Sequence, residues 1–340
     1  MKQRELQAVA VAIVVAIVID LLIVSGVINP YWELIIQYAC IVAIATLGLN
    51  IIYGFNGQFS LGHVAFYGLG AYASALVTKA FLGESPLLTD ALANYEPLVF
   101  LASILIGGLF AALVAYLIGL PILRLGSDYL GIATLGFGFI VKVAFDNADG
   151  LIPAMGGARG MTGIIKLTSW PWVAAVAIVA VVVMRNFVYS SHGRALLSVR
   201  EDEIAANSMG INIARYKTIA FVMGCFYAGV AGALYAHLYT FLHPSNFDFL
   251  KSIDLLLIVV LGGLGSMSGT IIAALGWTFL LEGLRVLLPT EILDFRFVIY
   301  PLLLIAAMLL RPQGLFGGME LPFLRAPKVE KRSQRVTTES

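Results

Sequence analysis

The chain has 340 residues, of which 60% are hydrophobic and only 12% are charged, and its formal net charge is +1. A water-soluble protein of this length should carry about 25% charged residues, because its surface must be solvated. The composition therefore excludes an ordinary soluble domain, and the near-neutral charge gives no indication of nucleic-acid binding.

Several apolar runs are long enough to cross a bilayer core, which is about 30 Å thick and needs about 20 helical residues. The first run follows a basic head, is too long for a signal-peptide core and has no small-residue cleavage site after it, so we expect it to be retained. Hydropathy and breaker residues predict ten membrane segments, at 6–27, 33–53, 61–80, 97–120, 128–145, 171–188, 216–239, 251–265, 269–288 and 297–310. The predicted fold class is an all-α polytopic membrane protein with about ten transmembrane segments.

Most lysines and arginines fall on the same side of the membrane as the N-terminus under this count. Because cytoplasmic loops carry the excess of basic residues, both termini are predicted to be cytoplasmic. Residues 1–315 then form the transmembrane domain, with a cytoplasmic loop at 189–216, and residues 316–340 form a basic tail that we expect to be disordered. The eighth segment is short and begins with charge, so it could be a full span, a tilted span or a re-entrant hairpin with the ninth. The even count requires that it crosses.

Small residues on the seventh segment predict close helix packing. Gly224, Ala228 and Gly232 recur every four residues there, which lets a neighbouring helix approach closely. The two cysteines, Cys40 and Cys225, both lie inside apolar runs, so they do not predict a disulfide.

The stretch GFNGQFSLGH joins the second and third segments and combines glycines with polar side chains, namely Asn56, Gln58, Ser60 and His63. Non-helical backbone at membrane depth is tolerated only where protein or a water-filled cavity satisfies it. The stretch is therefore either a break in a helix that lines a pathway or a simple cytoplasmic turn.

The longest cytoplasmic connection, GRALLSVREDEIAANSMGINIARYK, has the signals of one short helix. Ser198 and Glu201 form a capping box, and the acidic residues 201–203 lie at the positive end of the helix dipole. Gly210 supplies a left-handed stop, and Asn212 can cap the next membrane helix. The expected apolar face comprises Ile204, Ala205, Ala206 and Met209. Because so short a helix is marginal alone, the connection is either a docking device or a solvated loop between two spans.

Here the sequence resembles a known family. Two adjacent small residues, Ala205 and Ala206, are followed after a gap of three residues by Gly210. This pattern resembles the core of the loop by which bacterial ABC importer permeases engage their ATPases. The wider string REDEIAANSMGI resembles the LivM-type permeases of high-affinity branched-chain amino-acid uptake systems. Further matches are YKTIAF, AGVAGALYA, NGQFSLGHVAFYGLGAY, SDYLGIATLGFG, LGGLGSMSGT and RPQGLFG.

The resemblance implies a permease subunit of an ABC importer for branched-chain amino acids in the bacterial inner membrane. It implies as partners a second, related permease, two cytoplasmic ATP-binding subunits, an extracellular substrate-binding protein and the surrounding lipid. ATP and Mg²⁺ would bind to the ATPase subunits, whereas this chain would hold no cofactor or metal and catalyse no reaction. The residues expected to couple to the ATPases are Ser198, Arg200, Glu201, Asp202, Glu203, Ala205, Ala206, Met209 and Gly210.

Two alternatives stay open at this point. A permease for urea or short amides would share these motifs, and an ion-coupled carrier or channel would work without an ATPase. No Gly-Lys-Ser/Thr phosphate-binding loop occurs in the sequence, so an ATPase would have to be another polypeptide. The glycine-rich run from Gly262 is instead predicted to be a tight turn.

Charged residues within the predicted segments are few and are interpreted as structural. Glu282 can pair with Arg285 one helical turn away, and Asp20 and Asp254 are expected to be paired or to snorkel. The histidines at 63, 237 and 243 lack metal-ligand spacing. No clamp for a carboxylate or an ammonium group is visible, so selectivity is expected to lie largely in the binding protein.

Overall fold

The computed structural model describes residues 2–82, 95–123 and 127–287, together with 302, 305, 309–311, 313–317, 319–321 and 324. The elements in these ranges are helices and turns, with one isolated bridge between Met161 and Leu242. The α-helices are α1 (Lys2–Val24), α2 (Pro30–Leu49), α3 (His63–Leu82), α5 (Glu96–Ile122), α6 (Ser127–Asp146), α7 (Trp170–Val188), α8 (Ser191–Glu201), α9 (Glu203–Ser208), α10 (Ile213–Tyr239), α11 (Phe249–Gly262) and α12 (Met267–Leu287). The predicted all-helical fold class is thus confirmed for this part of the chain.

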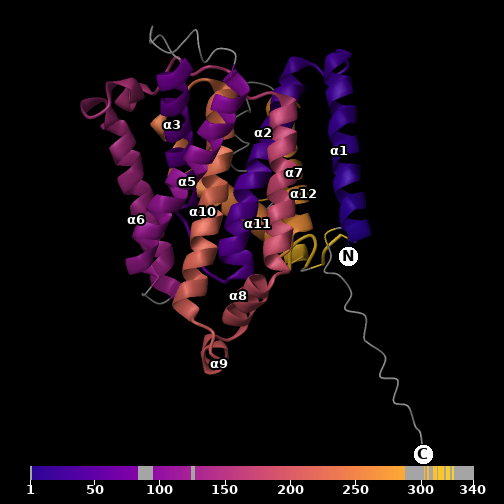
Figure 1. The fold of residues 1–340 in the computed structure, drawn as a ribbon, viewed down its shortest axis with the longest axis vertical. Coiled ribbons are helices and arrows are strands. Elements are labelled where there is room, and N and C mark those ends of the chain that lie inside the picture. Colours follow the sequence, from indigo (N-terminus) through magenta and orange to yellow (C-terminus); the bar gives the residue numbers. More distant parts are fainter. Residues whose placement is uncertain are drawn as a thin grey trace, which may run out of the picture.

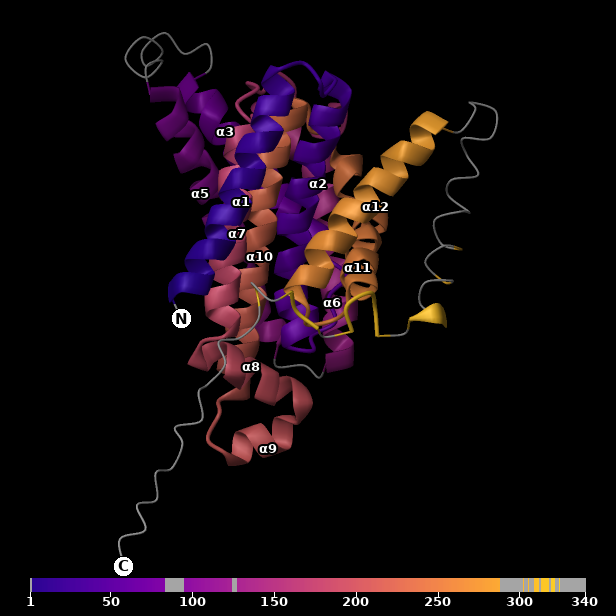
Figure 2. The ribbon, with the colours of Figure 1, turned by 90° about the vertical axis from the view of Figure 1, so that its right-hand side faces the viewer.

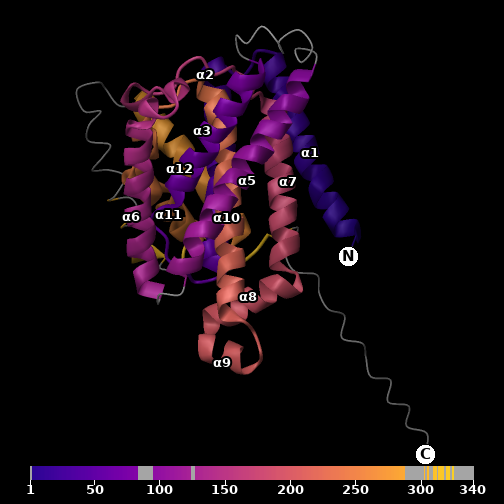
Figure 3. The same ribbon diagram turned by 60° about the vertical axis from the view of Figure 1, so that its left-hand side comes forward.

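The long helices run side by side and form one bundle (Figure 1). Figure 3 shows α6 at one edge of the bundle and α1 at the other, with α3, α5 and α10 between them. The short helices α8 and α9 project from one end, and α1 begins toward that same end. We call it the α9 end. The opposite end carries the loop between α6 and α7, whose Met161 pairs with Leu242.

Six helices within the described ranges are long and apolar enough to cross a membrane, namely Pro30–Phe55, His63–Leu82, Glu96–Ile122, Tyr129–Asp146, Trp170–Val188 and Ile213–Tyr239. They correspond to the predicted segments two to seven. Shorter apolar stretches occupy Val9–Val24 of α1 and Met267–Gly283 of α12. The tenth predicted segment, 297–310, lies mostly outside the described residues.

The eighth predicted segment is the short helix α11, which has 14 residues and a length of about 21 Å. This is less than the roughly 30 Å of a hydrocarbon core, so the helix alone is too short for an upright span. Figure 2 shows α11 and α12 side by side, joined by a turn near the α9 end. The two helices therefore pack against each other and are joined by a short turn.

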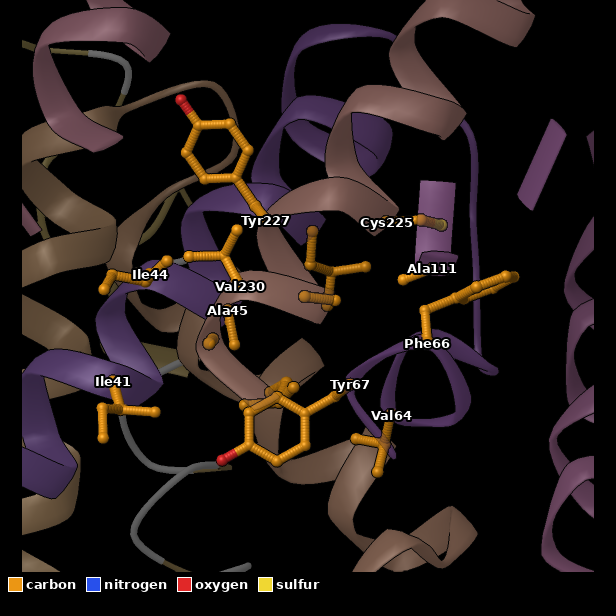
Figure 4. Packing of buried hydrophobic residues seen from close by; sticks show 14 of the residues in the cluster. Ile41, Ile44, Ala45, Val64, Phe66, Tyr67, Ala111, Cys225, Tyr227 and Val230 are labelled. Carbon is orange, nitrogen blue, oxygen red and sulfur yellow. The ribbon is translucent and has the colours of Figure 1, made fainter. Parts of the chain in front are cut away.

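The core is centred on α10, which packs directly against α2, α3 and α5. Figure 4 shows Ile44 and Ala45 of α2, Phe66 and Tyr67 of α3 and Ala111 of α5 around Tyr227 and Val230 of α10. The predicted close approach of the seventh segment is confirmed. A Cβ on Gly48 would lie 2.5 Å from the carbonyl oxygen of Gly224, and a Cβ on Gly232 would overlap the carbonyl of Tyr67. Glycine is required at these positions because backbone occupies the place of a side chain.

Candidate functional site

The end of α2 is the first irregular part of the bundle. Residues Asn50–Phe55 form a π-helix, a form that occurs frequently at functional sites. The following residues, 56–62, are not helical, and Gly57 has a left-handed φ of +73°. The next helix begins where the His63 Nε2 atom lies 3.0 Å from the carbonyl oxygen of Ala45. Ala45 precedes Phe55 by ten residues, which corresponds to roughly 15 Å of helix. Segment 56–62 therefore runs back alongside α2, inside the bundle, over about this distance.

The polar residues predicted for this stretch, Asn56, Gln58, Ser60 and His63, are all at most 3% exposed. Several of their polar atoms have no hydrogen-bond partner among the described residues, namely Asn56 Nδ2 and Oδ1, Gln58 Oε1, Ser60 Oγ and His63 Nδ1. An unpaired polar atom in an apolar interior costs about 1 to 3 kcal/mol, so such atoms do not gather in an ordinary dry core. Their burial favours the broken-helix interpretation over a surface turn.

Asn50 fixes the end of α2 to the turn between α11 and α12. Its Nδ2 atom donates to the carbonyl of Ser266 at 3.0 Å and to the Thr270 hydroxyl at 2.9 Å, and its Oδ1 atom accepts from the Gly265 N–H at 3.0 Å. A Cβ on Gly54 would lie 2.5 Å from that same Gly265 nitrogen. The π-helix and the turn are therefore held in direct backbone contact.

The turn itself confirms the prediction for the glycine-rich run. Gly263 and Gly265 both have positive φ angles, of +105° and +78°. The Glu320 carboxylate caps the start of α12 by accepting from the N–H groups of Met267 and Ser268 at 2.6 and 3.0 Å. A carboxylate is favoured there because the N-terminal N–H groups of a helix are unpaired.

The predicted boundary between membrane domain and tail differs from the structure. Phe316 donates to the carbonyl of Gly262, and Leu324 is buried. The packed domain thus continues beyond residue 315, because this segment closes over the α11–α12 turn. Residues 325–340 of the predicted tail lie outside the described residues.

Arg200 joins this region to the α9 end. It extends from the last turn of α8, and its Nη1 atom donates to the carbonyl of Gly54. A Cβ on Gly57 would lie 3.2 Å from Arg200 Cγ, and a Cβ on Gly265 would lie 3.0 Å from Arg200 Nη1. One side chain therefore touches the π-helix, the non-helical segment and the α11–α12 turn.

The predicted single helix from Ser198 to Gly210 is wrong. The structure has two helices, α8 and α9, which meet at Asp202 in an extended conformation with φ −157°. Asp202 caps α9 by accepting from the N–H groups of Ile204 and Ala205 at 2.8 and 3.0 Å. Aspartate and serine are both favoured N-caps, and here the first helix already begins at Ser190. Ser198 lies inside it, where its hydroxyl donates to the carbonyl of Arg194 at 3.0 Å.

The predicted apolar face on this loop is also divided. Ala206 is buried, whereas Ile204 and Met209 are 81% and 82% exposed, and Ala205 is exposed as well. With only six residues, α9 directs Ala206 toward the bundle and the larger side chains away from it. Ile204 and Met209 are therefore exposed apolar side chains at the tip of the α9 end.

Glu203 ties α9 to the first turns of α10. Its carboxylate lies 2.6 Å from the Lys217 ammonium, and Lys217 is itself buried. The left-handed stop at Gly210 is confirmed by its φ of +81°, and the cap at Asn212 by a 3.0 Å bond from the Arg215 N–H.

Among the predicted residues, the structure brings Arg200 together with the segment that contains Asn56 and Gln58. Ser198, Glu201 and Met209 are exposed on α8 and at the end of α9 instead. Sequence reasoning missed four contributors, namely Asn50, Lys217, Gly265 and Glu320. An amide in the middle of an apolar segment was a usable signal for Asn50, whereas the other three are recognised only through their partners.

Substituted-cysteine labelling tests whether segment 56–63 is hydrated. In a Cys40→Ala, Cys225→Ala background, Ser60→Cys should react with a small water-soluble thiol reagent severalfold faster than Ser103→Cys. Ser60 Oγ lacks a hydrogen-bond partner among the described residues, whereas the equally buried Ser103 hydroxyl donates to the Phe100 carbonyl and accepts from Ser74. Equal rates at the two positions would contradict a hydrated segment.

The comparisons with known proteins agree on one family. A model described as the permease component of the branched-chain amino acid transport system matches residues 31–310. The high-affinity branched-chain amino acid transport system permease protein LivM of Escherichia coli K12 is 33% identical over 303 residues, which cover 79% of this chain and 66% of LivM. LivM of Salmonella typhimurium LT2 is 32% identical over 321 residues, covering 84% of this chain and 69% of the relative.

A second permease type is also similar. The permease protein LivH of Escherichia coli K12 is 24% identical over 298 residues, covering 82% of this chain and 92% of LivH. No solved structure matches. The chain spans about two thirds of the length of the LivM proteins, and the family match covers most of its own length. The chain belongs to the family of permease components of branched-chain amino acid transport systems.

Proposed function

We propose that this protein is the permease subunit of an ATP-driven importer that moves branched-chain amino acids across the bacterial inner membrane. The family match over residues 31–310 supports the transport class. The observation that carries the mechanism is the contact of Arg200 with Gly54 and Gly265, because it links an exposed loop to the interior of the bundle.

The proposed topology has ten crossings and both termini in the cytoplasm. Six long apolar helices and the shorter α1 and α12 support eight of these crossings. The ninth is assigned to α11 together with residues 240–248, which include the 3₁₀-helix Pro244–Phe247, and the tenth to the sequence-predicted segment 297–310, which lies mostly outside the described residues. Arg194, Arg200, Arg215 and Lys217 lie in or beside α8 and α9, so the positive-inside rule supports a cytoplasmic α9 end.

The proposed partners follow from the family. The similarity to both LivM and LivH supports pairing with a second, related permease. Two cytoplasmic ATPase subunits would bind ATP and Mg²⁺ and would dock on α9. An extracellular binding protein would deliver the amino acid at the opposite end of the bundle. This chain would then act as a conduit and hold no nucleotide itself.

In the proposed mechanism, closure of the ATPases displaces α8 and α9. The displacement reaches the bundle along two contacts, from Arg200 to Gly54 and Gly265, and from Glu203 to Lys217 at the start of α10. Segment 56–62 is the part best able to rearrange, because helical hydrogen bonds do not hold it. We propose that Asn56, Gln58, Ser60 and His63 line the pathway that this rearrangement opens and closes.

Reconstitution tests the proposed function. Proteoliposomes that contain this chain with its cognate permease and ATPases should take up labelled leucine when supplied with ATP and the binding protein. Unlabelled isoleucine and valine should compete, whereas urea and acetamide should not. Uptake that needs no ATP and is abolished by an ionophore would instead identify an ion-coupled carrier, and competition by urea alone would identify an amide permease.

The exposed apolar side chains of Ile204 in α9 and of Met209 directly after it should anchor the ATPases. Ile204→Asp with Met209→Asp should release the ATPase subunits from the purified complex, because a buried interface anchor contributes about 2 kcal/mol or more. Co-purified ATPase activity measures the loss. Leu151→Asp is the control, since Leu151 is equally apolar and exposed but lies in the loop between α6 and α7. Retention of the ATPases by the double variant would refute docking at α9.

Arg200 should be needed for transmission rather than for assembly. Arg200→Ala should keep the ATPases bound but lower the leucine transported per ATP by about two- to thirtyfold, the range expected for a residue that couples two sites. Arg194→Ala is the matched control, because Arg194 lies on the same helix and donates to the Tyr189 carbonyl near its own end. Normal transport per ATP in the Arg200 variant would exclude this route.

A further inference from the structure

A charged pair lies beside a cluster of aromatic side chains that come from three helices. The tyrosine cluster consists of Tyr38 of α2, Tyr67 of α3, and Tyr235 and Tyr239 of α10, and its interacting rings have centres 4.8 to 6.1 Å apart. The pair is Lys251 and Asp254 in the first two turns of α11. The Lys251 ammonium lies 5.4 Å from the centre of the Tyr38 ring, within the range of a cation–π contact.

The charged pair and the cluster lie partway along the bundle rather than at an end. Lys251 precedes the end of α11 at Gly262 by eleven residues, which places it about 16 Å above the α11–α12 turn. Tyr38 precedes Asn50 of α2 by twelve residues, or about 18 Å. Because Asn50 binds that same turn, both groups lie near the middle of a membrane about 30 Å thick.

The Lys251 ammonium interacts with Tyr38, and the two charges of the pair do not hydrogen-bond to each other. Lys251 Nζ and Asp254 Oδ2 are 3.9 Å apart, which is beyond the 2.7 to 3.2 Å of a hydrogen bond. The two side chains are 37% and 40% exposed. By contrast, the pair of Lys217 and Glu203 is closed at 2.6 Å. Charges exposed to hydrocarbon are costly, so a loosely paired, exposed couple at mid-depth indicates a polar route.

Resting on the proposed import function, we propose that Lys251 and Asp254 form a transient binding station for the zwitterionic head group of a free amino acid. The substrate carboxylate would bind the Lys251 ammonium, and the substrate ammonium would bind the Asp254 carboxylate and face Tyr38. The rings of Tyr235 and Phe247, whose centres are 6.2 Å apart, offer an apolar wall for an aliphatic side chain. When the substrate binds, Lys251 and Asp254 each exchange the other's charge for a charge of the zwitterion. The net charge at this depth therefore does not change.

Polar groups lie on both sides of the station along the length of the bundle. Toward the outer end, the Tyr31 hydroxyl donates to Glu282 at 3.3 Å, and Arg285 lies 3.6 Å from the same carboxylate. Toward the α9 end, Ser252 accepts from the N–H of Val64, directly after His63. The station thus lies between the polar group of Tyr31, Glu282 and Arg285 on one side and the non-helical segment 56–62 on the other.

This assignment revises the expectation that selectivity lies almost entirely in the binding protein. The clamp was not visible in the sequence, where Lys251 and Asp254 are simply two charges three residues apart near a segment end. Their role is indicated only when α2 places Tyr38 against Lys251.

The test removes the station without leaving an orphan charge. In the reconstituted complex, the double variant Lys251→Met, Asp254→Asn should raise the KM for leucine uptake by about tenfold or more, as expected for lost hydrogen bonds to charged groups. Stimulation of the ATPases by loaded binding protein should persist. The matched control is Lys142→Met, Asp248→Asn, since that pair has similar exposure and a 3.3 Å separation but lies between α6 and the start of α11. Asparagine at 248 keeps the helix cap.

A second measurement uses the unaltered complex. A photoreactive leucine carrying a diazirine, irradiated during turnover, should label peptides that contain Tyr38, Tyr235 or residues 251–254. Leucine uptake by the double variant equal to that of the control, or label confined to other peptides, would overturn the station. Failure of the unaltered complex to import leucine at all would instead overturn the proposed function, so the two failures are distinguishable.

Discussion

The architecture depends on one close approach, that of the end of α2 to the turn between α11 and α12. Asn50 makes three hydrogen bonds across it, and Gly54 allows the backbones to meet. Arg200 enters the same junction from α8. The absence of a Cβ at Gly57 and Gly265 leaves room for the Arg200 side chain, because a Cβ there would lie 3.2 Å from Arg200 Cγ and 3.0 Å from Arg200 Nη1. Three parts of the chain that are distant in sequence are thereby joined at one point.

This junction explains how a membrane bundle can be both tightly packed and able to respond. The interface of α10 with α2, α3 and α5 is built from glycines and alanines whose backbones touch, so it behaves as a rigid unit. Segment 56–62 is different, because it lacks helical hydrogen bonds and buries polar atoms that have no hydrogen-bond partner in the part of the chain that the structure describes. A displacement of Arg200 is therefore expected to move this segment more readily than the interface of α10. The segment lies beside the proposed route of the substrate.

Some features were predictable from particular residues and others were not. The period of small residues at Gly224, Ala228 and Gly232 predicted the close face of α10, because that spacing is a local property of one helix. The stop at Gly210 and the cap at Asn212 were predictable for the same reason. The cap at Ser198 was predicted wrongly, because Asp202 is an equally good cap and the choice depended on where α8 begins. It begins at Ser191, three residues after the end of α7 at Val188.

The sequence by itself determined that the chain is an apolar helical bundle, which helices are long enough to cross a membrane, and to which family it belongs, because hydropathy, breakers and motifs are properties of contiguous residues. Only the tertiary structure decided that Arg200 reaches Gly54, that Glu320 caps α12, that polar atoms of segment 56–63 are buried without partners among the described residues, and that Lys251 lies against Tyr38 of the tyrosine cluster. These features join residues that are far apart in the chain, and their energies depend on burial and on the distance between partners, which a linear pattern does not contain.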